Sequence, residues 1–255
     1  MTSAATSISR ERLPAMRQMR RAHLETLLAN QAHPEKDRTG SATNSVAGSL
    51  RFLAVADFVL DGDVSSFRGL SAKAANQRLS LLVRGCDGEQ ISPSYLSMSN
   101  FKSMLTALAA GEFSLAYAIA QNMTAKYDSY DDALTRALGR SIKYAVLDEP
   151  DEMRAWTDRL VKVCEKNKYS AFHGYASTMQ SIAGQDVEGV RNGLASIVAG
   201  HSKLCRPGAL FSYTEDELLC MWGIGMSNLA ASRGLHVELD HALIPRELMV
   251  QPQGA

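Results

Sequence analysis

His201 and Cys205 are the residues whose types and spacing come nearest to a metal site. They lie four positions apart, so both side chains would share one face of a helix. A structural zinc site takes four ligands, however, and no further closely spaced pair of histidines or cysteines accompanies them. Pro207 also indicates that the helix ends here, which favours a packed or capping role for His201. We therefore expect no metal site.

Two glycines, Gly223 and Gly225, resemble the start of a dinucleotide-binding fingerprint. Asn228 stands where the fingerprint requires its last glycine, and no predicted strand precedes the motif. We interpret these small residues as a place where two helices approach closely. The motifs of P-loop proteins, zinc proteases and serine hydrolases are absent from the sequence.

Single residues with reactive side chains fit packed positions better than catalytic ones. His173 lies beside aromatic residues on a predicted helix, and Cys220 lies in an apolar run, where a thiol behaves as a small hydrophobic group. We therefore predict no catalytic residue, no cofactor and no enzymatic activity. An enzyme of unfamiliar type that uses His173, His201 or Cys205 is one alternative.

Acidic residues form the two strongest candidates for a binding surface. The first group surrounds Pro150 and the second follows Thr214; their members are Asp148, Glu149, Asp151 and Glu152, and Glu215, Asp216 and Glu217. Both groups are expected in the first turn of a helix, where carboxylates interact favourably with the helix dipole. Alternatively, they form a negative surface that attracts a basic partner and speeds its association.

The composition is that of a folded protein without the charge excess of a nucleic-acid binder. The chain has 255 residues, and 27 Lys and Arg balance 27 Asp and Glu. Its four cysteines are scattered, which argues against a disulfide framework. The first residues lack the apolar centre of a secretory signal. The longest apolar stretch, residues 50–60, is interrupted by Arg51 and Asp57 and is shorter than the roughly 20 residues of a membrane span. We expect a cytoplasmic protein that contacts neither membrane nor nucleic acid directly.

Apolar residues recur with the helical period along most of the chain. The first predicted helix spans residues 8–31, and a polar loop over 33–45 leads to Asn44 or Ser45 as the N-cap of the next, which Gly62 ends. Further helices are predicted over residues 64–84, 99–110, 112–126, 130–147, 151–166, 170–183, 186–200 and 215–232. We expect residues 1–40 to form an N-terminal helix and linker that pack on a domain of residues 41–255.

The last predicted helix has clear signals at both ends. Thr214, with Glu217 three positions later, predicts a capping box at its start. Gly234 is expected to end it with a positive φ. Residues 236–239 then read as the one strand-like piece, too short to build a sheet.

A weak internal repeat predicts how these helices are arranged. Residues 105–120 and 179–195 both read as apolar helix, glycine, polar residues and apolar helix, with Gly111 and Gly184 at the turns. Helical hairpins of this length stack in α-solenoids. The predicted fold is therefore an all-α array of antiparallel, tetratricopeptide-like hairpins with a short extended C-terminal segment, although a generic helical domain has the same composition.

The C-terminal part of the sequence resembles the bacterial immunity protein 49 family. Its members carry a helix with L-A-x-x-R-G-L, then a short V-x-V/L-D segment and a P-x-E/A-L tail. The matching residues are Leu229, Ala230, Arg233, Gly234, Leu235, Val237, Leu239, Asp240, Pro245, Glu247 and Leu248. Upstream, residues 182–201 are similar to a family turn and helix that lead to a histidine, here His201.

The resemblance implies an all-α cytoplasmic protein that binds and neutralises a cognate toxin domain, expected to be one that attacks nucleic acid. The matching residues His201, Arg233, Gly234, Asp240 and Pro245 are interpreted as structural. Residues 205–217 depart from the family pattern, so partner-specific contacts are expected there. Candidate toxin contacts are therefore Tyr213 with Glu215, Asp216 and Glu217, and secondly Asp148, Glu149, Asp151 and Glu152.

A tetratricopeptide-like adaptor that binds an extended peptide in a concave groove is the alternative function. Such a protein would carry Asn, Lys and Arg side chains inside its groove. The helical period alone does not locate such a groove.

Overall fold

The chain folds as an array of helices, and its computed structural model describes residues 8, 10–239 and 241–251. The α-helices of this part are α1 (Leu13–Gln31), α2 (Ser41–Asp61), α3 (Val64–Cys86), α4 (Phe101–Ala110), α5 (Phe113–Asn122), α6 (Ala133–Val146), α7 (Pro150–Cys164), α8 (His173–Ala183), α9 (Val187–Leu204) and α10 (Met221–Ser232). Short 3₁₀ turns lie between or after them: η1 (Pro93–Tyr95), η2 (Met98–Asn100), η3 (Ala125–Tyr130), η4 (Asn167–Phe172), η5 (Glu215–Glu217) and η6 (Arg246–Leu248).

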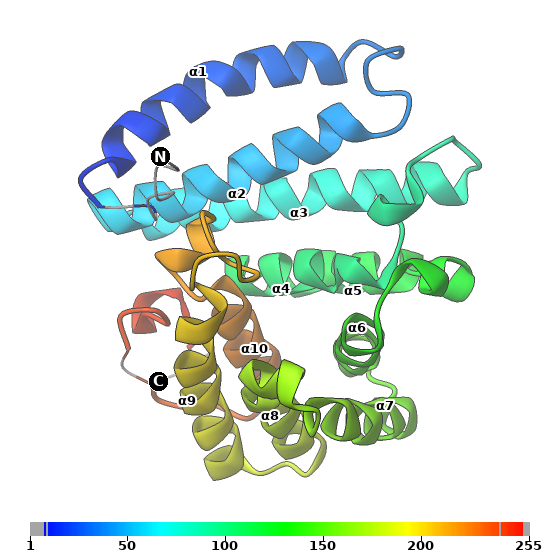
Figure 1. The fold of residues 1–255 in the computed structure, drawn as a ribbon, viewed down its shortest axis with the longest axis vertical. Coiled ribbons are helices and arrows are strands. Elements are labelled where there is room, and N and C mark those ends of the chain that lie inside the picture. Colours follow the sequence, from blue (N-terminus) through cyan, green and yellow to red (C-terminus); the bar gives the residue numbers. More distant parts are fainter. Residues whose placement is uncertain (1–7, 9, 240, 252–255) are drawn as a thin grey trace.

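Helices that follow one another in sequence pack on one another, as an all-α array requires. The closest such pairs are α1 with α2, α2 with α3, α6 with α7, and α8 with α9. Figure 1 shows the three long helices α1–α3 at one end of the molecule, α4 and α5 beneath them, and α6–α10 at the other end. The predicted all-α fold is confirmed.

The strand-like reading of residues 236–239 is wrong. These residues belong to no strand, and the isolated β-bridge seen in the described residues joins His241 and Ile244 farther along the chain. The segment keeps its place by burying Leu235 and Val237 in the main core.

Helix α4 is the centre of the core, because every residue of it except Lys102 is buried. It packs more extensively against α10 and α3 than against α5. At Gly225 of α10, a Cβ atom would lie 2.5 Å from the carbonyl oxygen of Leu105, so only glycine allows this approach. The interpretation of the two glycines as a close helix contact is thereby confirmed for Gly225.

Helix α1 covers one side of α2. Leu27 of α1 packs with Val46 and Leu50 of α2, and Leu13 packs with Phe52 farther along. Apolar burial of this kind is the main force that holds a terminal helix in place.

Glycines with positive φ end several helices where the sequence predicts it. Gly62 (φ 67°), Gly111 (φ 82°) and Gly234 (φ 80°) follow α2, α4 and α10 in the left-handed region, where a side chain would be strained.

Helix α2 begins earlier than predicted. Gly40, with φ 80°, precedes its first residue, so Asn44 and Ser45 lie inside the helix rather than at its cap. The physical reason lies in the preceding loop, where the Asp37 carboxylate accepts hydrogen bonds from the backbone N–H of Thr43 (2.9 Å) and from its hydroxyl (2.5 Å). This side chain, from outside the helix, satisfies one of the N–H groups that a helix start leaves without a partner.

Helix α10 begins later than predicted, at Met221, and the capping box at Thr214 does not form. The Thr214 hydroxyl donates to the carbonyl oxygen of Phe211, and residues 215–217 form the 3₁₀ turn η5. The Glu217 carboxylate instead accepts hydrogen bonds from the backbone N–H of Tyr213 (2.7 Å) and of Ile8 (2.9 Å).

Candidate functional site

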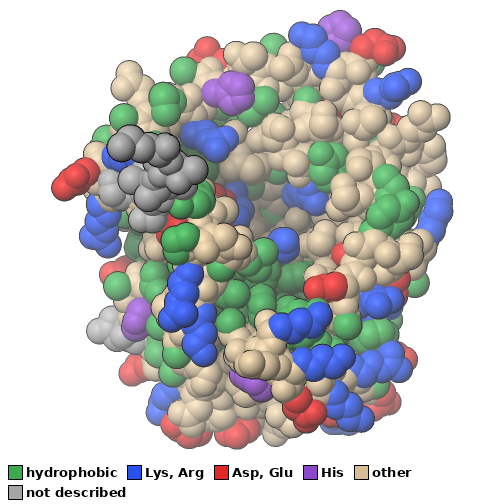
Figure 2. Space-filling model, viewed as in Figure 1, with side chains coloured by type: hydrophobic (Ala, Val, Ile, Leu, Met, Phe, Trp, Pro, Cys, Tyr) green, Lys and Arg blue, Asp and Glu red, His purple; other side chains and the backbone are tan. Residues whose placement is uncertain are grey.

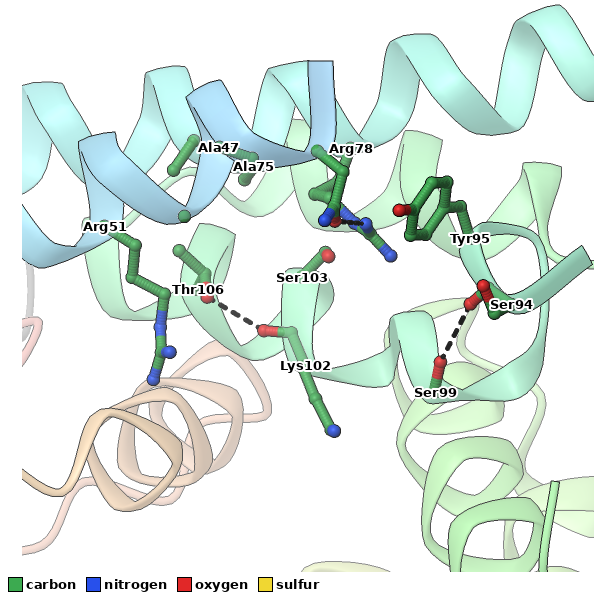
Figure 3. Close-up of a pocket in the computed structure, with 13 residues that line it drawn as sticks. Ala47, Arg51, Ala75, Arg78, Ser94, Tyr95, Ser99, Lys102, Ser103 and Thr106 are labelled. Carbon is green, nitrogen blue, oxygen red and sulfur yellow. Dashed lines mark hydrogen bonds between the residues drawn. The ribbon is translucent and has the colours of Figure 1, made fainter. Parts of the chain in front are cut away.

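A cavity of about 370 Å³ lies between α2, α3, α4 and the turns η1 and η2. Figure 2 shows this face of the molecule hollowed at its middle, with Lys and Arg side chains in and beside the hollow. Figure 3 shows the residues that line the cavity. Its volume falls within the range of ligand-binding pockets, roughly 300–1,000 Å³.

Three cations line this cavity, one from each surrounding helix: Arg51 from α2, Arg78 from α3 and Lys102 from α4. Among the described residues, no aspartate or glutamate lines it. The rest of its polar lining consists of one amide, from Asn44, and of hydroxyls, from Ser94, Tyr95, Ser99, Ser103 and Thr106. We name this the cationic cavity. Its lining offers hydrogen-bond donors and positive charge to an anionic group.

Arg51 differs from the other two cations because the chain itself supplies its counter-charge. Its guanidinium donates to the carboxylates of Glu215 (2.7 Å) and Asp216 (2.5 Å). Burial alone would lower the pKa of Arg51, but the charges of Asp216 and Glu215 overcome this and raise that pKa above its usual value. For the acid Glu215 the effect of burial has the opposite sign: burial raises its pKa, and the positive charge of Arg51 partly offsets the rise.

Within the part of the chain that the structure describes, the partners of Arg78 are neutral. Its two terminal nitrogens donate to the side-chain oxygens of Asn44 and Asn100, and its guanidinium lies 5.4 Å from the centre of the Tyr95 ring. Burial lowers the pKa of Arg78 to about 10. The pKa falls because the positive charge of Arg78 is shielded from water and no carboxylate among the described residues is paired with it.

Lys102 is the one exposed residue of α4, and its side chain extends from α4 away from α2 and α3 (Figure 3). Its ammonium group lies 5.7 Å from the ring centre of Trp222. The pKa of Lys102 is lowered, mainly because the surrounding protein partly shields its charge from water and also because Arg51 and Arg78 repel it, while the carboxylates of Asp216 and Asp131 act in the opposite direction. The charges of Arg51 and Arg78 therefore reach Lys102.

A second cavity, of about 250 Å³, meets the cationic cavity at Lys102, which lines both. Its lining is largely aromatic and aliphatic, with Phe101, Leu134, Leu138, Tyr169, Phe172, Leu210 and Trp222, and it also includes the polar residues Asp132, Thr135 and Lys168. We name this the apolar cavity, and the two cavities together the cleft. In Figure 2, hydrophobic side chains form the surface directly below the hollow.

The acidic residues 215–217 lie at one end of the cleft, but they face inward. Asp216 is buried, and both its carboxylate and that of Glu215 are bound to Arg51. The expected acidic surface therefore does not form at these two residues, because their negative charge is neutralised within the chain. Tyr213 is exposed, and its backbone has a positive φ of 61°.

The first acidic group lies on the surface. Glu149, Asp151 and Glu152 are exposed at the start of α7, and Asp148 forms an ion pair with Arg233. We name residues 148–152 the acidic turn. A third cavity, of about 430 Å³, adjoins it and is lined by Asp148, Arg233 and apolar residues that include Phe113, Tyr117 and Val146.

Two residues of the C-terminal sequence motif, His201 and Arg233, make contacts with distant parts of the chain. His201 is buried, and its Nε2 atom lies 2.6 Å from the carbonyl oxygen of Asp216, to which it donates. Arg233 reaches the carbonyl oxygen of Ala145 (3.4 Å). Pro245 precedes the turn η6, and Asp240 lies outside the described residues.

Sequence reasoning missed the three cations of the cationic cavity. The one signal for them is a charge within an apolar run, as at Arg51 between Leu50 and Phe52. Arg78 and Lys102 are brought to the same cavity only by the packing of α3 on α4.

No group of three or more His, Cys, Asp or Glu side chains in the described residues is arranged to hold a metal ion. In the same part of the chain, every helix is too short or too polar to cross a membrane. Comparison with protein-family models, with curated proteins and with solved structures found no match.

Proposed function

We propose that this protein works by binding another protein, without catalysis, and that the cleft receives an acidic segment of that partner. The observation that carries the proposal is the lining of the cationic cavity, which holds three cations and, among the described residues, no carboxylate. Positive groups enclosed by protein attract an acidic partner more strongly than the same groups on an open surface. The Asn, Lys and Arg side chains that a groove-binding adaptor would carry are present here as Asn44, Arg51, Arg78 and Lys102.

The test is a titration of the protein with a glutamate-rich peptide and with a lysine-rich peptide of equal length, followed by calorimetry. We expect the acidic peptide alone to bind, and its affinity to fall as salt is raised, because exposed charge pairs are screened. Lys102→Glu reverses the charge at the exposed residue of α4 and should abolish binding. Lys73→Glu, at an exposed lysine of α3 outside the cavity, is the control. Equal binding by the two variants would contradict the proposal.

A second candidate role is that of an immunity protein, which neutralises a cognate toxin that attacks nucleic acid. The resemblance of residues 218–248 to the immunity protein 49 family supports it, as does the exposed acidic turn beside an apolar cavity. A toxin that binds nucleic acid presents a basic surface, to which an acidic turn is complementary. This role moves the expected toxin contact from Glu215 and Asp216 to the acidic turn.

Co-expression with the toxin encoded beside this gene tests the immunity role. We expect this protein to rescue growth, and Glu149→Gln, Asp151→Asn and Glu152→Gln together to weaken the rescue. Asp148 is left unchanged because its ion pair with Arg233 is part of the fold. Failure of the unaltered protein to rescue would rule out immunity against that toxin and leave the cleft proposal unaffected.

A further inference from the structure

We infer that the cleft recognises a two-part peptide motif, in which carboxylate side chains bind Arg78 and Lys102 and a neighbouring bulky apolar side chain enters the apolar cavity. This inference rests on the proposed function and specifies the chemistry of the partner segment. It rests on two observations. The cationic cavity is lined by cations and, among the described residues, by no carboxylate, and Lys102 lines both this cavity and the apolar cavity.

The chain's own residues indicate the ligand of the cationic cavity. At one end, the carboxylates of Glu215 and Asp216 bind Arg51. In the described part of the chain, neither Arg78 nor Lys102 has a carboxylate oxygen within 4.0 Å, the limit for an ion pair. An incoming acidic side chain would give Arg78 and Lys102 the negative charge that Glu215 and Asp216 already give Arg51. Hydrogen bonds between ionised partners are the strong ones.

Arg78 keeps part of its hydrogen-bonding capacity for a ligand. Both of its terminal nitrogens already donate to amide oxygens, those of Asn44 and Asn100, so its fork is partly used. A bidentate contact uses two of the five N–H donors of a guanidinium, and its geometry suits carboxylate and phosphate oxygens alike. The ammonium group of Lys102 is a compact positive charge that can donate a hydrogen bond to one oxygen of a carboxylate.

The apolar cavity explains why an acidic side chain would be only part of the motif. Lys102 lines both cavities, so a ligand bound to its ammonium group has the apolar cavity directly beside it. Leu210 stands at the rim with 46% of its surface exposed, over a floor that includes Phe101 and Trp222. A peptide can fill both cavities, whereas an inorganic anion can fill only the first.

The experiment uses the full chain and fluorescein-labelled peptides of about ten residues, long enough to extend roughly 35 Å and span both cavities. The first peptide carries a run of Asp and Glu followed by Leu and Phe. The second replaces Leu and Phe by Ser, and the third replaces Asp and Glu by Asn and Gln. Fluorescence anisotropy gives the affinity of each, and inorganic phosphate is added as a competitor.

We expect the first peptide to bind about tenfold or more tightly than the second, because burial of one large apolar side chain corresponds to at least that factor. The third should not bind. Leu210→Ser should weaken the first peptide to the level of the second while leaving the second unchanged. Leu28→Ser, at a leucine of α1 that is also 46% exposed, should change neither.

The possible results distinguish a failure of the two-part motif from a failure of the proposal that the cleft binds an acidic segment. Equal affinity of the first and second peptides overturns the two-part motif and leaves the acidic-segment proposal standing. Binding of none of the three peptides at about 1 mM overturns both. Displacement of the first peptide by inorganic phosphate at an equal concentration also overturns the inference, since the cavity would then be a site for simple anions.

Discussion

Replacement of Arg51 by alanine should strongly destabilise the protein, because it leaves two carboxylates without their counter-charge. Arg51 binds Glu215 and Asp216 from a position 164 and 165 residues earlier in the chain. The substitution removes the link between α2 and the turn η5 and leaves the acidic pair enclosed. The backbone of η5 is still held by His201 through the carbonyl oxygen of Asp216.

The size of the effect follows from how far these groups are buried. The side chains of Glu215 and Asp216 are 13% and 4% exposed, and that of Arg51 is 22% exposed. Removal of one partner from a buried ion pair costs about 3–5 kcal/mol, and the partial exposure of Arg51 places this case near the lower end. A loss of about 3 kcal/mol lowers the melting temperature of a chain of this size by about 6–12 °C.

The loss should depend on pH in a defined direction. Burial raises the pKa of Glu215 in the folded state, and Arg51 works against that rise, so its removal raises the pKa further. A carboxyl group whose pKa is higher in the folded state binds a proton that the unfolded state releases. The free energy of unfolding therefore falls as pH rises from about 4.3, the ordinary glutamate value, through the folded pKa. Arg51→Ala extends this window upward, so the variant should lose more stability at neutral pH than under acidic conditions.

Urea denaturation of both proteins, monitored by circular dichroism at about pH 5 and about pH 7, measures the effect. Arg154→Ala is the control, because Arg154 is exposed and its pairing with Asp151 is a surface contact at 3.5 Å. A loss for Arg51→Ala that equals the control, or that is the same at both pH values, would refute the account of a buried ion pair.

Three further substitutions test the packing. Gly234→Val should destabilise the protein by about 1–2 kcal/mol through backbone strain alone, since a Cβ there meets no atom within 4 Å; Gly69→Ala, in equally open space on α3, should not destabilise it. Gly225→Ala should cost about 1–3 kcal/mol in urea denaturation, because its Cβ would press on the backbone of α4. Asn228→Ala should cost about 1–3 kcal/mol and speed hydrogen exchange at the backbone N–H of Val250, which donates to Asn228 at 2.8 Å; unchanged exchange would show that this bond does not hold the C-terminal segment.

The sequence predicts the helices well because their signals are local. Gly62, Gly111 and Gly234 each mark a helix end through a property of one residue, the freedom to adopt positive φ. The start of α2 could not be predicted in this way. Its first turn is stabilised by Asp37, a residue of the preceding loop that reaches Thr43 only after the loop has folded.

The cleft could not be predicted because its parts are distant in sequence. Arg51, Arg78 and Lys102 lie on three helices and share a cavity only in the folded chain. The residues 215–217 show the converse problem. Three adjacent carboxylates suggest an acidic surface, but two of them fold inward onto a cation that precedes them by more than half of the chain.

The ion pairs between Arg51 and η5 also impose an order on events while the chain is being made. A ribosome adds roughly 5–20 residues per second, so the 165 positions between Arg51 and Asp216 take about 8–33 s to synthesise. Late in that interval Arg51, Arg78 and Lys102 have been made, but Glu215 and Asp216 have not. An acidic molecule that reaches Arg51 before η5 is complete would therefore compete with the chain's own carboxylates for it. Completion of η5 ends this competition, because Glu215 and Asp216 then occupy Arg51 and leave Arg78 and Lys102 as the cations of the cationic cavity without a carboxylate partner among the described residues.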